Sequence, residues 1–282
     1  MKGANILSAA LCMASMVSMF SCSMTTGIDN YSSAGLIYEL NASEDGYIVV
    51  GCDSIEKNVR IPTFYQDLPV VAVDDRAFFG RDDITRIIIG NNVTKIGQEA
   101  FYKCVSLKDL TIDGALENIG NYSFYGCSDL HYVTLPDSVM SIGNYSFYGC
   151  SDLYYVTLPD SVMSIGDSAF RGCYALTEID LSESLINIGS EAFYYCVGLT
   201  NIKIPKNVTS IGSNVFYGCA KLNGIRFDAT ETWYITNSGV QWMHKTGGTE
   251  IDVVKPSANA TYFKETHNNY YWYKISTETK VE

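Results

Sequence analysis

The chain has 282 residues, of which 47% are hydrophobic and 18% are charged, and its formal net charge is −12. This acidity, without any cluster of Lys or Arg, argues against nucleic acid or anionic lipid headgroups as partners, because both need a basic footprint. The length is sufficient for a large hydrophobic core.

The first 22 residues have the features of an export signal. Lys2 supplies a positive charge, and the mainly apolar run from Ile6 to Phe20 is shorter than the ~20 residues of a membrane span. A small residue then precedes Cys22, as in the lipobox of bacterial lipoproteins. We expect residues 1–22 to be a lipoprotein signal peptide, Cys22 to carry the lipid, and residues 23–35 to be a polar tether. Secretion without a lipid is the alternative.

Residues 36–69 are predicted to form an N-terminal β cap. Leu36–Leu40 and Tyr47–Val50 read as strands around a polar turn, and a strand-like segment ends at Pro62. Pro62 lies 28 residues before its counterpart Gly90, although the repeat that follows has a period of 23 residues. An insertion is therefore expected within Thr63–Pro69.

From residue 70 to residue 227 the sequence repeats every 23 residues, and such internal repetition is diagnostic of a solenoid. Cys follows the repeated Phe after three residues in six of the copies, and Ile-Gly precedes it in the same six. The repeated Phe residues are Phe78, Phe101, Phe124, Phe147, Phe170, Phe193 and Phe216.

Each copy predicts one short strand and one return path. In the copy around Phe147, Val156 and Leu158 have the period-two spacing of a strand with one buried face, and Pro159 ends that strand. The segment Ser146–Cys150 is expected to form a tight helical or 3₁₀ corner. One copy cannot bury its apolar face alone, so about seven rungs should stack at roughly 4.8 Å per strand.

The motif Ser-Ile-Gly-x-x-x-Phe-Tyr-Gly-Cys-x-x-Leu-x-x-Val-x-Leu-Pro-x-x-Val resembles the BspA-type, or Treponema-type, leucine-rich repeat over about 160 residues. The resemblance implies an α/β-type leucine-rich-repeat solenoid that is β-rich with short helical or 3₁₀ corners. It also implies a bacterial surface or secreted protein, because some family members are adhesins for host matrix proteins or other bacteria. Function varies widely on such scaffolds.

Six cysteines occupy one slot of the repeat and should stack as a column. We expect them to be small buried hydrophobic residues, while a bridge between adjacent rungs stays possible. A single column cannot supply four tetrahedral ligands, and no Cys-x-x-Cys occurs, so no zinc site is predicted. The six are Cys104, Cys127, Cys150, Cys173, Cys196 and Cys219.

The outward residues of the strands are the predicted binding face, with Tyr132 and Tyr155 at its centre, because Tyr is a favoured interface residue. An ordinary solvated sheet face is the alternative. Residues 119–141 and 142–164 differ only in that Tyr154 replaces His131, which indicates a surface position, with a specialised role for one copy as the alternative. The predicted face consists of Asp109, His131, Tyr132, Thr134, Tyr155, Thr157, Glu178 and Asp180. A second tyrosine column after the core Phe is expected to pack partly between rungs.

Residues 228–282 are predicted to be a C-terminal β and aromatic cap. Trp233 is expected to close the array, and Ala260–Lys264 and Asn269–Ile275 read as strands that could pair as a hairpin. The alternative function of this tail is an aromatic glycan platform formed by Trp242, Tyr270 and Trp272.

No catalytic motif occurs, and His244 and His267 in the tail have no nucleophile at a defined spacing. We therefore predict a protein that is not an enzyme and needs no cofactor. The expected function is adhesin-like binding of a host or bacterial surface or matrix protein, with glycan binding or a passive structural role in the envelope as alternatives. The expected location is the bacterial cell envelope, lipid-anchored to the outer membrane and exposed at the surface.

Overall fold

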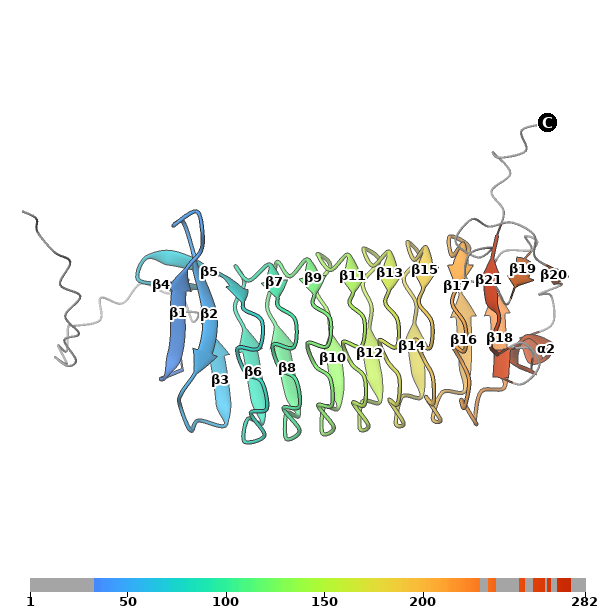
Figure 1. Ribbon diagram of the computed structural model, residues 1–282, viewed down its shortest axis with the longest axis horizontal. Coiled ribbons are helices and arrows are strands. Elements are labelled where there is room, and N and C mark those ends of the chain that lie inside the picture. The colour runs from blue at the N-terminus through green and yellow to red at the C-terminus, as the bar shows by residue number, and fades with distance from the viewer. Residues whose placement is uncertain are drawn as a thin grey trace, which may run out of the picture.

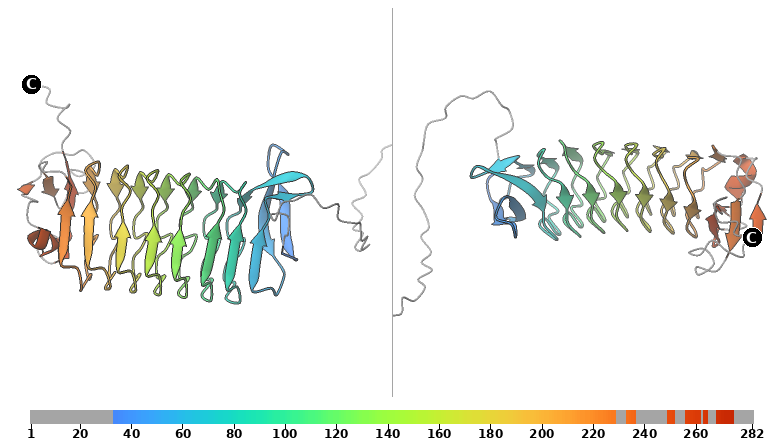
Figure 2. Two further views of the ribbon diagram at one scale, coloured as in Figure 1. Left: turned by 180° about the vertical axis from the view of Figure 1, so that it is seen from behind. Right: turned by 90° about the horizontal axis from the view of Figure 1, so that it is seen from above.

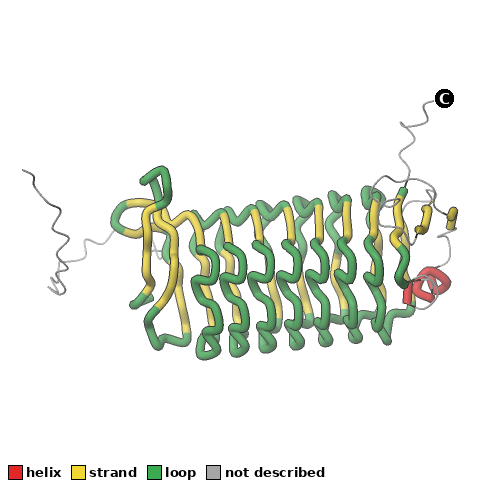
Figure 3. The backbone as a smooth tube through the Cα atoms, in the orientation of Figure 1, coloured by secondary structure: helices red, strands yellow, loops and turns green. Residues whose placement is uncertain are grey.

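The computed structural model describes residues 33–228, 233–236, 249–251, 256–261, 263–264 and 268–274. Successive turns of the chain stack into an elongated slab with a cap at each end (Figure 1). Strands lie along both long sides of the slab, and turns and loops join the two sides on every rung (Figure 3). This is the β-rich solenoid that the 23-residue period predicts.

One long side of the slab carries eight strands that pair in parallel, six in one sheet and two in another, and we call this side the main sheet. Seven strands belong to the repeats, and the eighth, β3, belongs to the N-terminal cap. The strands are β3 (Asn58–Ile61), β6 (Arg86–Ile89), β8 (Asp109–Ile112), β10 (Tyr132–Thr134), β12 (Tyr155–Thr157), β14 (Glu178–Asp180), β16 (Asn201–Ile204) and β18 (Gly224–Phe227).

The return path of each rung contributes a two-residue strand to a second, 13-stranded sheet. These strands are parallel to one another and follow one after another along the slab (Figure 2). They are β7 (Lys95–Ile96), β9 (Asn118–Ile119), β11 (Ser141–Ile142), β13 (Ser164–Ile165), β15 (Asn187–Ile188) and β17 (Ser210–Ile211).

The N-terminal cap continues both sheets. Antiparallel β1 (Leu36–Leu40) and β2 (Tyr47–Cys52) extend the second sheet through β5 (Leu68–Val73). β3 pairs with β6 at an offset of 28 residues, as in Asn58↔Arg86. β4 (Phe64–Tyr65) turns back onto β5 through Gln66 and Asp67, which both have positive φ, as a two-residue hairpin turn requires. This hairpin lies within the insertion that the sequence predicts at residues 63–69.

The corner after each return strand consists of turns, not of the helical or 3₁₀ segment that was expected. The amides of Tyr145, Phe147 and Gly149 donate to carbonyls of the next rung, at 2.7–2.8 Å. The amides between them donate to carbonyls three residues back. Tyr145 and Gly149 have φ of 56° and 70°, and a left-handed residue at every fourth position interrupts the right-handed run that a helix needs. The corners are thus hydrogen-bonded from rung to rung.

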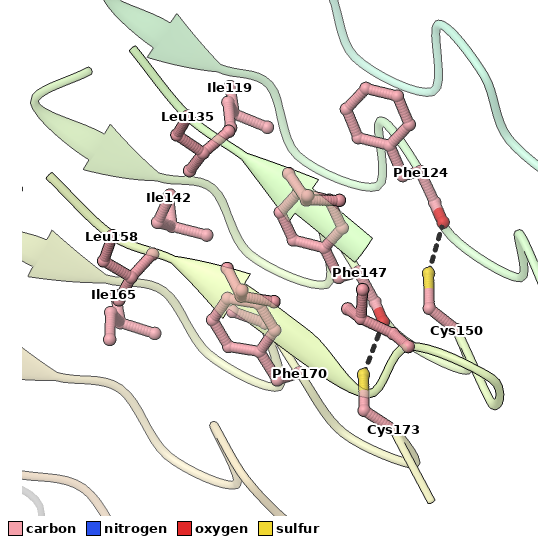
Figure 4. Close-up of a cluster of buried hydrophobic side chains, with 14 of the residues drawn as sticks. Ile119, Phe124, Leu135, Ile142, Phe147, Cys150, Leu158, Ile165, Phe170 and Cys173 are labelled. Carbon is pink, nitrogen blue, oxygen red and sulfur yellow. Dashed lines mark hydrogen bonds between the residues drawn. The ribbon is translucent and has the colours of Figure 1, made fainter. Parts of the chain in front are cut away.

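The core lies between the sheets and the corners. The seven repeated Phe are fully buried, and their rings stack in one column with centroids 5.0–5.6 Å apart. Within the rung of Phe147, Ile142 and Leu158 belong to the same buried cluster as the Phe ring, and Cys150 lies at the edge of that cluster (Figure 4). Burial of one Phe side chain contributes about 1.5–3 kcal/mol, so the column is a major source of stability.

Candidate functional site on the main sheet and the corners

Tyr132 and Tyr155 lie side by side on the main sheet. They pair in register between β10 and β12, and they are 42% and 41% exposed. Val133 and Val156, the next residues on the two strands, are fully buried. Because side chains alternate between the faces of a strand, the two tyrosines project outward and form an adjacent aromatic pair.

Acidic side chains flank this pair on both sides. Asp109 pairs with Tyr132, and Glu178 pairs with Tyr155. Asp109 has a basic neighbour, since Arg86 Nε lies 3.6 Å from its Oδ2. Glu178 and Asp180 form no ion pair with any residue in the described part of the chain. The C-terminal side of the pair therefore carries uncompensated negative charge.

The other predicted face residues surround the tyrosine pair. Thr134 and Thr157 pair in register, and Asp180 continues their row on β14. His131 is half-buried beside the more exposed Tyr154, and their ring centroids are 6.5 Å apart. The structure thus brings the eight predicted residues together on four neighbouring rungs.

A second aromatic surface runs along the corners. Its side chains follow the core Phe by one residue, and neighbouring rings stack with centroids 4.6–5.1 Å apart. We call this column the tyrosine ladder; it comprises Phe79, Tyr102, Tyr125, Tyr148, Tyr194 and Tyr217. The rings of the tyrosine ladder thus pack against one another between rungs, as the sequence predicts, and a stacked ring has its face covered by its neighbour.

Arg171 interrupts the tyrosine ladder. It occupies the slot between Tyr148 and Tyr194, and its guanidinium carbon lies 5.5 Å and 4.2 Å from the two ring centroids. Its Nη1 donates to Glu191 Oε2. Burial acts to lower the pKa of Arg171, but Glu191 and the neighbouring tyrosines outweigh it and raise the pKa. Sequence reasoning missed Arg171, although its departure from the repeated Tyr was a usable signal.

The column of cysteines is buried, as the sequence predicts, and its described thiols are free. Each Sγ donates to the carbonyl of a Phe in the preceding rung, as Cys150 does to Phe124 at 3.3 Å (Figure 4). Burial raises the pKa of Cys104 and Cys219 to about 12. Protonated thiols are weak nucleophiles, so this column is structural.

The two described residues of the predicted aromatic platform, Tyr270 and Trp272, do not form an exposed aromatic surface. Trp272 is fully buried, and its ring stacks on Phe263 with the centroids 3.9 Å apart. Tyr270 is half-buried and packs against the core. A glycan platform needs exposed ring faces, so Trp272 cannot serve as one. Trp233 is fully buried, as a closing residue should be.

The predicted hairpin of this tail is also wrong. Residues 256–261 form α2 (Pro256–Thr261). β21 (Tyr271–Tyr273) instead pairs antiparallel with β17 and with β19 (Trp233–Thr236), which in turn pairs with β20 (Thr249–Ile251). The cap thus continues the second sheet past its last rung, and the buried aromatic rings cover the end of the core.

Two predicted site residues, Cys22 and Trp242, lie outside the described residues. Within those residues, no helix is long and apolar enough to cross a bilayer. The same part of the chain holds no group of three or more His, Cys, Asp or Glu side chains placed to bind a metal ion.

Comparison with solved structures supports the fold. The leucine-rich repeat protein of T. pallidum is 30% identical, with a TM-score of 0.64, over 68% of this chain and 90% of that protein. A leucine-rich cell surface protein from Faecalibacterium prausnitzii is 26% identical, with a TM-score of 0.53, over 82% of this chain and 62% of that protein. No curated protein matches the chain.

The family model for the BspA type leucine-rich repeat region matches residues 52–153 and 117–238 in six copies. These matches cover more than half of the sequence and include every rung that carries the tyrosine pair, the tyrosine ladder and the cysteine column. The chain therefore belongs to the BspA-type leucine-rich repeat family.

Proposed function

We propose that this chain is a non-catalytic binding protein of the bacterial cell surface, and that it engages another protein through the main sheet around Tyr132 and Tyr155. The observation that carries the proposal is the exposed tyrosine pair beside Glu178 and Asp180, neither of which forms an ion pair within the described part of the chain. Tyr supplies a large contact area at a low cost in side-chain entropy, which is why it recurs at interface hot spots.

The charge of this face indicates the chemistry of the partner. Lys203, at the C-terminal end of the main sheet, lies 2.8 Å from Glu183 and 2.6 Å from Asp228, so its charge is already neutralised. Glu178 and Asp180 have no such neighbour in the described residues, and they would attract a Lys or Arg of the partner. A partner with a basic patch beside an apolar one fits this surface.

An outward location at the cell surface is part of the proposal. The F. prausnitzii relative is named as a cell surface protein, and the N-terminal sequence supports export with lipid attachment at Cys22. We propose that the chain is lipid-anchored to the outer membrane and faces outward. Protease treatment of intact cells tests this directly, because an inward-facing chain would survive until the cells are broken.

Binding to purified extracellular-matrix proteins, measured by surface plasmon resonance, tests the sheet face. The double variant Tyr132→Thr, Tyr155→Thr keeps residues that suit a strand, since Thr already occupies outward positions 134 and 157. We expect at least about tenfold weaker binding, with an unchanged thermal unfolding midpoint.

Two controls separate the possible outcomes. Glu178→Gln should weaken binding mainly at low salt, as expected for an exposed charge. Tyr125→Leu on the tyrosine ladder should leave binding unchanged. Equal affinity of the double variant and the parent chain would refute the tyrosine pair as the site, and the absence of any protein partner would favour a passive structural role.

A further inference from the structure

A pocket of about 280 Å³ opens where Arg171 interrupts the tyrosine ladder. Gly149 and Gly172 are among the residues that line it, and a Cβ on Gly172 would make an ordinary van der Waals contact of 3.7 Å with the Gly149 Cα. Arg171, Tyr174 and Tyr195 also line the pocket, and we call the two tyrosines its walls. Such a volume lies just below the range of about 300–1,000 Å³ that drug-sized ligands occupy, so it suits a single ring.

Three departures from the repeat create this pocket. Arg171 replaces the Tyr of the ladder, and Tyr174 stands where the two preceding rungs have Ser128 and Ser151. Tyr195 occupies a slot that is Gly in five other rungs, and it shares their left-handed conformation with a φ of 57°. This slot is left-handed in every rung, including at Lys103, so the departure at position 195 lies in the large aromatic side chain and not in the backbone.

The walls expose aromatic surface that stacking does not consume. Tyr174 is 52% exposed and Tyr195 is 42% exposed. Tyr195 meets the ring of Tyr217 at 62° and that of Tyr194 at 44°, so neither neighbour covers its face as a stacked ring would. A flat ligand can therefore lie against these rings, as it could not against the stacked members of the ladder.

The polar groups of the pocket favour a ligand with hydroxyl groups. In the described part of the chain, the side-chain hydrogen bond of Arg171 runs from Nη1 to Glu191, which leaves its other N–H groups for a ligand. The ion pair with Glu191 neutralises the guanidinium, so an anionic ligand gains little there. An apolar side chain of a peptide would leave the guanidinium and the tyrosine hydroxyls without partners, which costs binding energy.

From this geometry we infer that the pocket binds one neutral pyranose ring of a glycan. The less polar face of the sugar packs on Tyr174 or Tyr195, and its hydroxyl groups accept from Arg171 and exchange hydrogen bonds with the tyrosine hydroxyls. This site is separate from the protein-binding face proposed above, because it lies on the corners and uses none of the main-sheet residues. Either site can fail without the other.

The experiment uses the full chain and soluble probes. Methyl β-glucoside, lactose and di-N-acetylchitobiose represent neutral sugars, sodium glucuronate an acidic one, and N-acetyltryptophanamide an aromatic side chain. Saturation-transfer NMR and calorimetric titration measure binding, for which we expect a Kd on the order of 1 mM for at least one neutral sugar.

Two variants that return the pocket to the repeat remove its walls without endangering the fold. Tyr174→Ser installs the residue found at Ser151, and Tyr195→Gly installs the residue found at Gly172. Each should weaken sugar binding by about tenfold or more while the thermal unfolding midpoint does not fall. Arg171→Tyr, which restores the ladder, should do the same. Tyr132→Thr on the main sheet is the matched control and should leave sugar binding unchanged.

The remaining outcomes would overturn the inference. Tighter binding of glucuronate than of the glucoside would indicate an anion site. Binding of N-acetyltryptophanamide alone would indicate a pocket for a peptide side chain. A lack of binding of every neutral sugar, or binding that survives all three pocket variants, would show that no sugar site exists at Arg171.

Discussion

The guanidinium carbon of Arg171 lies 4.2 Å from the ring centroid of Tyr194, in a slot where the other repeats place an aromatic ring. A cation over an aromatic face is attracted by the ring quadrupole, and the planar guanidinium stacks as a ring would. The column of stacked side chains thus continues through a charged residue, and the rung keeps its register.

This contact should be measurable as a coupling free energy. In a double-mutant cycle with Arg171→Ala and Tyr194→Leu, we expect the two changes to be coupled by about 0.5–1 kcal/mol in the free energy of unfolding. Urea unfolding of the four chains measures it. The same cycle with Lys103→Ala and Tyr194→Leu is the control, because Lys103 contacts Tyr102 and not Tyr194. If the effects of Arg171→Ala and Tyr194→Leu on the free energy of unfolding are additive, the contact between Arg171 and Tyr194 does not stabilise the fold.

The buried Phe column should dominate stability. Phe147→Ala removes a fully buried ring that stacks on Phe124 and Phe170, and we expect it to lower the free energy of unfolding by about 3–5 kcal/mol. Phe147→Leu should cost less, because it leaves a smaller cavity. Tyr132→Thr, on the surface, should change stability by about 0.5 kcal/mol or less. If Phe147→Ala lowers the free energy of unfolding by no more than Tyr132→Thr does, Phe147 is not packed in the core.

Stability should fall at alkaline pH. Burial raises the pKa of Cys104 from 9.0 to about 12, so the native state keeps a proton that the unfolded chain loses. The thiol therefore has no effect on the free energy of unfolding below about pH 9, and stability declines by about 1.4 kcal/mol per pH unit for this thiol as the pH rises toward 12. Urea unfolding under reducing conditions at several pH values measures the slope. Cys104→Ala should make it shallower, and an identical slope in the variant would refute the assignment.

Two glycines of one rung should respond differently to Ala. A Cβ on Gly143 would lie 2.6 Å from the backbone oxygen of Ile119, so the rungs would have to separate. Gly149 has a φ of 70°, and a Cβ there would meet only the Gly126 Cα, at an ordinary 3.9 Å, so Gly149→Ala should cost about 1–2 kcal/mol through backbone strain alone. We expect Gly143→Ala to lower the free energy of unfolding, measured with urea, by more than Gly149→Ala does. A larger loss for Gly149→Ala would show that backbone strain at Gly149 outweighs the clash between rungs at Gly143.

The repeat made much of the fold predictable from the sequence. Phe147 and its counterparts mark the rungs, and strand alternation places Tyr132 outward because Val133 is apolar. The corner was harder to predict, since Tyr145 and Tyr195 adopt a left-handed conformation that their residue types disfavour. Hydrogen bonds between rungs hold the backbone there, and a single repeat read alone does not contain them.

The candidate sites were predictable only in part. The pairing of Tyr132 with Tyr155 follows from the period of the repeat. The pocket at Arg171 depends on residues from two neighbouring rungs, and its walls become evident only when the departures at 171, 174 and 195 are placed in space. Trp272 reads as an exposed aromatic residue in the sequence, but antiparallel pairing with β17 places it over the end of the core.

Because residues 119–141 and 142–164 are nearly identical, mutation of the gene can change the number of rungs in the solenoid. Unequal recombination between the two coding segments would delete or add one whole rung without disturbing the stacked core. Loss of one copy would leave a single tyrosine on the main sheet and bring Arg171 about 4.8 Å closer to the N-terminal cap. Closely related strains could therefore differ in affinity for a protein partner and still share the same pocket at Arg171.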